Sequence, residues 1–233
     1  MLSRSGLVTM LPLSNVETRG GEPVPPCAGL APDVFPEATS SQTGVSVGYV
    51  PDEEKNWYVF RASYGRADSA SDFLIEAGTY VYVAKRYERK TVNGQAQRKL
   101  VPLIPNLLFV YATLPDAKHF VKDTPALHYL SFYLDHFSID AEGKNPPLVI
   151  PDNQMANFIK ATWSHNEHLK FVNESQCHFK GGEIVRVVEG PFVGVEGRVA
   201  RVAGQQCVVI SITSLGLVST AYVPTAFIEE VRD

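Results

Sequence analysis

The feature that most constrains the fold is a glycine-punctuated run of β-branched residues at positions 182–199. Valines recur on both sides of a turn that contains Gly190, Gly194 and Gly197. Valine favours strands, whereas glycine permits the sharp turns and close backbone approaches of a small barrel, where a Cβ would often clash. The run therefore predicts a strand, a tight turn and a second strand.

The same composition continues to the end of the chain and predicts an all-β unit over residues 181–233. Because β-branched side chains lose χ1 freedom in a helix, we expect this unit to keep its strands and not to refold into helices. Five strands are predicted, at 183–188, 196–202, 207–212, 217–222 and 227–231.

A second unit is predicted over residues 56–140. Its expected elements are a strand at 57–63, a helix ending at Gly78, a hairpin formed by 79–92 and 95–113, a helix at 116–122 and a strand at 130–137. The helix that precedes Gly78 shows apolar residues at helical spacing. Asn93-Gly94 suits a two-residue type I′ turn, because both central residues need a positive φ. The order predicts a β-α-β-β-α-β sheet with its helices packed against it.

The remaining segments connect or precede these units. Residues 141–180 are predicted to be a linker that contains one helix, 152–169, capped by Asp152. Residues 1–55 are predicted to be a disordered extension, because the stretch 18–48 is rich in Pro, Gly, Ser and Thr.

Charge is distributed unevenly along the chain. The 233 residues are 45% hydrophobic, enough for ordinary cores, and the net charge of −4 argues against a protein that coats nucleic acid by bulk charge. Residues 85–99, however, hold six basic side chains against Glu88 alone. Positive charge is thus concentrated on the predicted hairpin.

The chain offers little for a metal or a reaction centre. Cys27, Cys177 and Cys207 match no disulfide framework, which favours a reducing cytoplasm. His165 and His168 with Cys177-His178 do not have the spacing of a standard zinc site. The sequence shows no Gly-rich phosphate loop, nucleophile elbow or apolar run of 18 residues. We therefore expect no enzyme activity, no cofactor, no metal and no membrane span.

Several of these segments resemble one family. The run 182–199 resembles a KOW motif, with Gly190, Pro191, Phe192, Gly194 and Gly197 at its positions. Residues 102–110 resemble a strand entry of the NusG N-terminal domain and come closest to the paralogue RfaH. Residues 149–155 and 220–228 are similar to UpxY-type antiterminators of capsular polysaccharide operons. The resemblance runs from Asn56 to the end and implies an α+β fold: a NusG-type (NGN) α/β sandwich domain followed by a KOW SH3-like β-barrel.

The resemblance also implies a function and a partner. It indicates a transcription elongation or antitermination factor whose first domain binds the clamp helices of RNA polymerase through an apolar depression and suppresses pausing or termination. The barrel would recruit a ribosomal protein or the termination factor Rho. The residues at the matching polymerase-binding positions are Ile104, Pro105, Leu107 and Phe109, with Tyr82 and Tyr87 at the rim. The alternative for these side chains is a place in the core, since strand alternation buries one face.

Nucleic acid is the second implied partner. Basic side chains would rest against upstream or non-template DNA, where phosphate contacts position a protein without reading sequence. The alternative is a solvated hairpin. The candidate residues are Lys85, Arg86, Arg89, Lys90, Arg98 and Lys99 on the hairpin, and Arg61 and Arg66 with Tyr64 near the end of the first strand.

Two other functions remain open at this stage. One is a KOW-type RNA- or ribosome-binding protein without a polymerase contact, although residues 181–233 hold only four basic side chains against six acidic ones. The other is a housekeeping NusG, which would lie among translocation and ribosomal-protein genes and not among glycosyltransferase genes.

Overall fold

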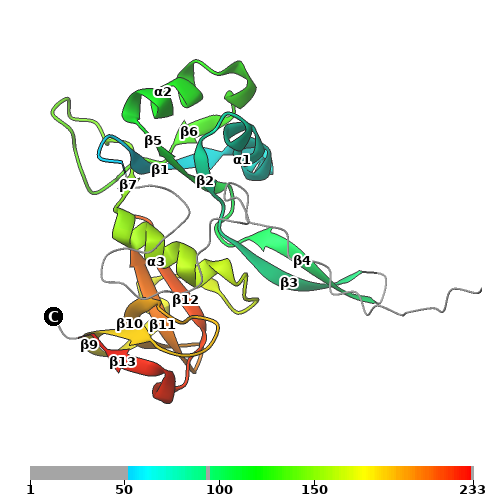
Figure 1. Cartoon of the computed structure of the whole chain (residues 1–233), viewed down its shortest axis with the longest axis vertical. Coiled ribbons are helices and arrows are strands. Elements are labelled where there is room, and N and C mark those ends of the chain that lie inside the picture. The colour runs from blue at the N-terminus through cyan, green and yellow to red at the C-terminus, as the bar shows by residue number, and fades with distance from the viewer. Residues whose placement is uncertain (1–51, 93–94, 232–233) are drawn as a thin grey trace, which may run out of the picture.

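The structure is a computed structural model and describes residues 52–92 and 95–231. Figure 1 shows two units, one above the other, with helix α3 (Asp152–Trp163) between them and a long hairpin reaching out to one side. The fold is α+β, with helices concentrated in the first unit. The predicted extension lies outside the described residues up to position 51, and so does the predicted Asn93-Gly94 turn.

The first unit is an antiparallel sheet with strand order β2-β5-β1-β6, and β7 also pairs with β1. Strand β1 lies in the middle and is buried over Trp57–Phe60, which explains its run of large apolar residues. Helices α1 and α2 cover one face of this sheet (Figure 1). The elements are β1 (Asn56–Ala62), α1 (Ala67–Glu76), β2 (Tyr80–Tyr82), β5 (Leu107–Ala112), α2 (Leu114–Lys122), β6 (Leu130–Phe132) and β7 (Val149–Ile150).

The predicted hairpin is divided into two parts. Its inner segments, β2 and β5, pair within the main sheet, whereas β3 (Lys85–Val92) and β4 (Gln95–Pro102) form a separate two-stranded sheet. The two segments predicted to form a long hairpin therefore do pair with each other, but the pairing is interrupted and divided between two sheets. The returning chain leaves β4 through Pro105 and through Asn106, which has a φ of 63°. Proline offers no N–H to a ladder and a positive φ breaks a strand, so the pairing cannot continue there.

The second unit is a six-stranded antiparallel sheet with order β13-β9-β10-β11-β12-β8. All five predicted strands are present, but β9 begins at Cys177, earlier than predicted, and β8 was not predicted. The strands are β8 (Lys170–Val172), β9 (Cys177–Val187), β10 (Glu196–Val202), β11 (Gln205–Ile212), β12 (Gly216–Tyr222) and β13 (Ile228–Glu230).

Helix α3 is shorter than predicted and its cap differs. The helix ends at Trp163 and is followed by His165, whose φ of 48° ends the helical path. Pro151 occupies the N-cap position without a side-chain cap, so the prediction of an Asp152 cap is wrong. Asp152 instead lies in the first turn, where its negative charge interacts favourably with the positive end of the helix dipole.

The two units share one apolar core. It contains side chains of β1, β2 and β5, the inner face of α3, and strands of the second sheet, from Trp57 to Val223. The opposite face of the first sheet has its own core with α1 and α2. Short 3-10 turns complete the described chain: Ser63–Gly65, Pro125–Leu127, Glu174–Gln176 and Thr225–Phe227.

Candidate functional surfaces

The side chains predicted to contact polymerase lie mostly in the shared core. Tyr82 of β2 and Phe109 of β5 are directly paired across the sheet and are 0% and 1% exposed. Leu107 and Ile104 are also buried. The positions that the sequence assigns to an apolar depression therefore form one continuous apolar face, and that face is covered.

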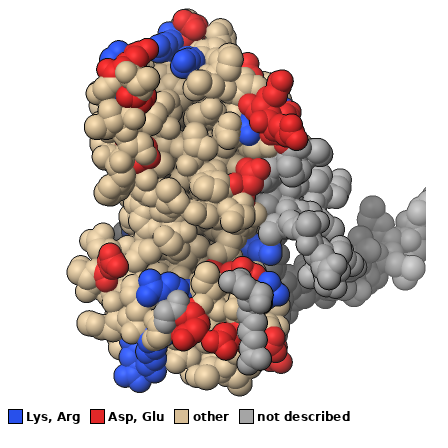
Figure 2. Space-filling model, turned by 90° about the vertical axis from the view of Figure 1, so that its left-hand side faces the viewer, with Lys and Arg blue, Asp and Glu red and all other residues tan. Residues whose placement is uncertain are grey.

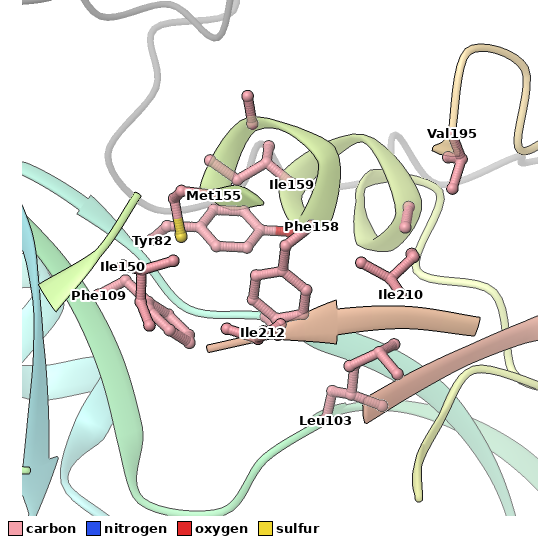
Figure 3. Close-up of a cluster of buried hydrophobic side chains, with 14 of the residues drawn as sticks. Tyr82, Leu103, Phe109, Ile150, Met155, Phe158, Ile159, Val195, Ile210 and Ile212 are labelled. Atoms are coloured by element: carbon pink, nitrogen blue, oxygen red, sulfur yellow. The ribbon is translucent and has the colours of Figure 1, made fainter. Parts of the chain in front are cut away.

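Helix α3 provides the cover. The ring of Phe158 lies 5.3 Å from that of Phe109 and 6.0 Å from that of Tyr82, edge to face with both. The hydroxyl of Tyr82 is hydrogen-bonded to that of Thr162 one turn further along. Figure 3 shows these rings beneath the helix, with Ile210 and Ile212 of the second sheet further along the same side of the helix. Helix α3 thus contributes to the core of both units.

Polar contacts fix α3 to the second unit. The Asn157 side chain donates to the carbonyl of Glu196 at 2.6 Å and accepts from its amide at 2.8 Å. Near the start of the helix, the Gln154 side chain accepts hydrogen bonds from both the amide and the hydroxyl of Thr213. Sequence reasoning missed these residues, because a helix predicted to lie in a linker gave no reason to look for partners.

Two predicted polymerase-binding residues remain accessible. Pro105 is exposed and lines a cavity of about 630 Å³ between the units, together with Arg86, Leu169 and Phe171. Tyr87 is half-buried at the base of the hairpin, where Arg98 lies over its ring at 3.9 Å.

The base of the basic hairpin is held by the loop after α3. Arg89 forms two hydrogen bonds of 2.8 Å with the carboxylate of Glu167, and Arg86 donates to the carbonyl of the same residue. The amide of Tyr87 donates to the carbonyl of His165 at 2.9 Å. On the other side, Lys85 pairs with Asp68 of α1 at 2.8 Å. Three of the predicted nucleic-acid-binding residues, Lys85, Arg86 and Arg89, therefore also position the hairpin.

The other basic side chains of the hairpin, Lys90, Arg98 and Lys99, are less engaged by the rest of the protein. Lys90 pairs with Glu88 at 3.2 Å, and Lys99 lies opposite Glu88 across the strands. Within the part of the chain that the structure describes, Arg98 and Lys99 form no ion pair. Both side chains are exposed on β4, a strand that projects from the body of the protein (Figure 1). A projecting basic ribbon of this kind can approach a phosphate backbone.

A smaller basic and aromatic cluster lies at the end of β1. The Arg66 guanidinium is 4.1 Å from the Tyr129 ring centroid and 5.5 Å from that of Tyr64. Tyr64 is 87% exposed and has a φ of 61°, a conformation that is uncommon for a bulky residue. Arg61 is exposed on the preceding strand. Arg61 and Arg66 thus lie at the same end of the sheet.

The glycine-rich turn of the second unit has the geometry its composition predicts. Gly190 and Gly194 have φ values of 87° and 79°, and a Cβ on Gly197 would lie 2.5 Å from the carbonyl oxygen of Val209. Pro191 is exposed, whereas Phe192 is 2% exposed and belongs to the shared core. The turn is therefore built into the contact between the units.

His165, one of the residues considered for a zinc site, packs against the base of the hairpin. His165 is buried, and its ring bonds to the carbonyl of Lys85 at 3.2 Å. Burial lowers the pKa of His165, against the opposing effect of that hydrogen bond. Over residues 52–92 and 95–231 no group of three His, Cys, Asp or Glu side chains is arranged to hold a metal ion.

The helices in the same ranges are all too short or too polar to cross a membrane.

An antiparallel sheet with two helices on one face and a projecting basic hairpin defines the first unit as an α+β domain. Residues 55–159 match the family described as "Transcription termination factor nusG", so this part of the chain is a NusG-family domain. NusG is a family of transcription factors and not of enzymes, and the domain supports a general role in transcription elongation or termination. No curated protein matches the chain.

Proposed function

We propose that the protein is a transcription elongation and antitermination factor that binds RNA polymerase through its first unit and suppresses pausing or termination. The match of residues 55–159 to the NusG family carries this proposal. The resemblance of residues 149–155 and 220–228 to UpxY-type factors supports a specialised role on capsular or surface polysaccharide operons in the cytoplasm. The second unit is proposed to be a KOW domain that recruits a ribosomal protein or Rho.

The buried anchors set a condition on polymerase binding. Leu107, Phe109 and Tyr82 can contact a partner only if α3 separates from β2 and β5, because the ring of Phe158 occupies that face. A partner would have to replace the contacts of α3 with its own. Polymerase binding at this face therefore competes directly with the packing of α3.

The hairpin is proposed to contact upstream or non-template DNA. Arg98 and Lys99 are exposed on β4, opposite Arg89 and Glu88, and the ion pair of Arg89 with Glu167 holds the direction of the hairpin. The cluster of Arg61, Tyr64 and Arg66 is a second proposed nucleic-acid contact. Its aromatic and guanidinium planes suit unstacked bases better than a regular duplex.

The test uses purified RNA polymerase and a template with one pause site and one terminator. Wild-type protein is expected to bind the elongation complex, shorten the pause and raise read-through. The variant Arg98→Gln, Lys99→Gln is expected to bind more weakly than wild type at low salt, to depend less steeply on salt, and to lose part of this effect. Lys118→Gln, Lys122→Gln is the matched control, because it removes the same charge from exposed positions of α2.

The possible outcomes test the DNA contact of the hairpin separately from the binding of RNA polymerase. Equal activity of the two double variants would exclude the hairpin as the DNA contact. A wild-type protein that neither binds polymerase nor changes read-through, but binds ribosomal RNA, would overturn the proposal in favour of an RNA- or ribosome-binding protein.

A further inference from the structure

The loop that joins β6 to β7, residues 133–147, exposes two large apolar side chains. Phe137 is 85% exposed and Ile139 is 74% exposed, two positions apart. Among the described residues, no other large apolar pair this close in sequence has both members more than 70% exposed. Large apolar side chains held in water in this way commonly mark a protein contact.

Hydrogen bonds order the loop around these side chains. The Asn145 side chain donates to the carbonyls of Asp135 and Ser138 at 3.0 and 2.9 Å and so ties the two arms together. The Asp140 carboxylate accepts from the amides of Glu142 and Lys144. The Asp135 carboxylate accepts from the Ser138 hydroxyl and the Phe137 amide, and these bonds hold the pKa of Asp135 below its ordinary value.

The base of the loop is joined to the first sheet. The amide of Tyr133 donates to the carbonyl of Val59 at 2.9 Å, and the amide of Leu148 donates to the carbonyl of Tyr133 at 2.8 Å. Leu134 and Pro147 form a β-bridge that closes the loop. The two apolar side chains are therefore displayed on a pre-ordered support, which lowers the entropy cost of binding through them.

The surroundings indicate the chemistry of the partner. Figure 2 faces the side of the molecule that lies at the left of Figure 1, where the loop is, and shows a broad area without charge, with acidic groups to its right and both acidic and basic groups above and below it. The loop itself carries Asp135, Asp140 and Glu142 against one lysine, Lys144, which pairs with Glu142. A complementary surface would have an apolar pocket with basic residues around it.

We propose that loop 133–147 is an anchoring contact to RNA polymerase, with Phe137 and Ile139 inserted into an apolar pocket that has a basic rim. This inference rests on the proposed function. It is favoured over contact through β5 alone because Leu107 and Phe109 are buried in the shared core, Phe109 against Phe158 of α3, whereas the loop is accessible without any rearrangement. The loop and the basic hairpin leave the first unit on opposite sides (Figure 1), so a protein contact and a nucleic-acid contact can form together.

The experiment measures the affinity of purified core RNA polymerase for full-length protein by biolayer interferometry. For Phe137→Ser, Ile139→Ser we expect the Kd to rise about 10- to 100-fold, since truncating one central anchor costs more than about 1 kcal/mol. Ile184→Ser, Tyr222→Ser is the matched control, because it removes two exposed apolar side chains from the second unit. Its Kd is expected to change less than about twofold.

A second variant tests the ordering of the loop. Asn145→Ala keeps both apolar side chains but removes the hydrogen bonds that tie the arms together, so a smaller loss of affinity is expected. Circular dichroism checks that each variant keeps its fold, which the high exposure of the changed side chains favours.

The outcomes distinguish the two proposals. If wild-type protein binds polymerase and the loop variant binds equally well, the role of the loop is overturned and the proposed function stands. If wild-type protein does not bind polymerase at all, both are overturned. If the loop variant abolishes self-association of the chain in sedimentation without altering polymerase affinity, the occupant is a second copy and the inference is wrong.

Discussion

The two faces of the first sheet are covered in different ways. Tyr58, Phe60, Leu108 and Val110 pack against α1 and α2, whose sequences lie between or next to the strands. On the opposite face, Trp57 and Phe109 share a core with α3 and with strands beyond residue 184. One face is thus completed by nearby sequence and the other by distant sequence.

The two cores therefore differ in whether the elements that cover the sheet can be displaced by a partner. The helices α1 and α2 cannot leave without unfolding the first unit, whereas α3 and the second unit cover a face that a partner is proposed to use. A change in the first core should therefore affect stability alone. A change in the second should affect stability and also the accessibility of the face.

The largest effect is expected for Phe158→Ala. The substitution removes the ring that lies between Phe109 and Tyr82, and the free energy of unfolding should fall by about 3–5 kcal/mol. Chemical denaturation followed by tryptophan fluorescence measures the fall. Limited proteolysis should also show earlier cleavage around α3.

Leu74→Ala is the control for that prediction, because Leu74 of α1 is fully buried in the other core. It should cost about 2–5 kcal/mol without making the region around α3 more sensitive to protease. Equal protease patterns in the two variants would contradict the division into two kinds of core.

A smaller effect is expected for Asn157→Ala. The variant leaves the amide and carbonyl of Glu196 without the partner that now binds both, so about 1–3 kcal/mol should be lost. Hydrogen exchange of α3 measures whether the loss is local. Protection that falls in α1 as strongly as in α3 would show that the contact is not specific to the junction.

His165 should make stability depend on pH. Burial lowers its pKa in the folded protein, so the unfolded chain binds the proton more readily. The part of the free energy of unfolding that comes from the neutral, buried His165 is fully present above about pH 6.5, the ordinary pKa of histidine. It is lost as the pH falls below that value, by at most about 1.4 kcal/mol per pH unit for one proton. Thermal unfolding between pH 7.5 and 5 measures the slope.

His165→Asn should flatten that slope, since asparagine does not titrate and tolerates the positive φ at this position. A slope that survives in His165→Asn would assign the pH dependence to other groups.

The smallest effect is expected for Arg89→Gln. Its ion pair with Glu167 is largely solvent-exposed on the arginine side, so stability should change by less than about 1 kcal/mol. The change should instead loosen the hairpin, which faster exchange of the Tyr87 amide would report. Unchanged exchange would mean that the backbone contact to His165 is sufficient.

The sequence predicted the parts of the fold that depend on local pattern. Apolar spacing located α1, and the valine-rich segments located the strands of the second sheet. The sequence left two roles open for Leu107 and Phe109, a polymerase contact and a place in the core. The structure buries both side chains in the core. Which face α3 would cover was not visible, because that depends on contacts between residues about 50 to 100 positions apart.

Some signals were present but were not used. Met155, Phe158, Ile159 and Thr162 recur at the spacing of one helix face, which indicates a buried helix and not a simple connector. The partners of Asn157 and Glu167 could not have been found this way, since nothing local links them to Glu196 or Arg89. The division of the hairpin depends on Pro105 and Asn106, whose turn chemistry was readable in the sequence.

Phe109 is translated well before the residues that cover it, and this order has a consequence for biosynthesis. Strand β5 leaves the ribosome well before α3, and Ile212 follows about 100 residues after Phe109, an interval of roughly 5–20 s at ordinary bacterial rates of translation. During that interval α1 and α2 can already complete their side of the sheet, while the other side faces water. The nascent chain should therefore pass through a half-covered stage, and a trigger-factor-type chaperone would find its apolar binding surface there.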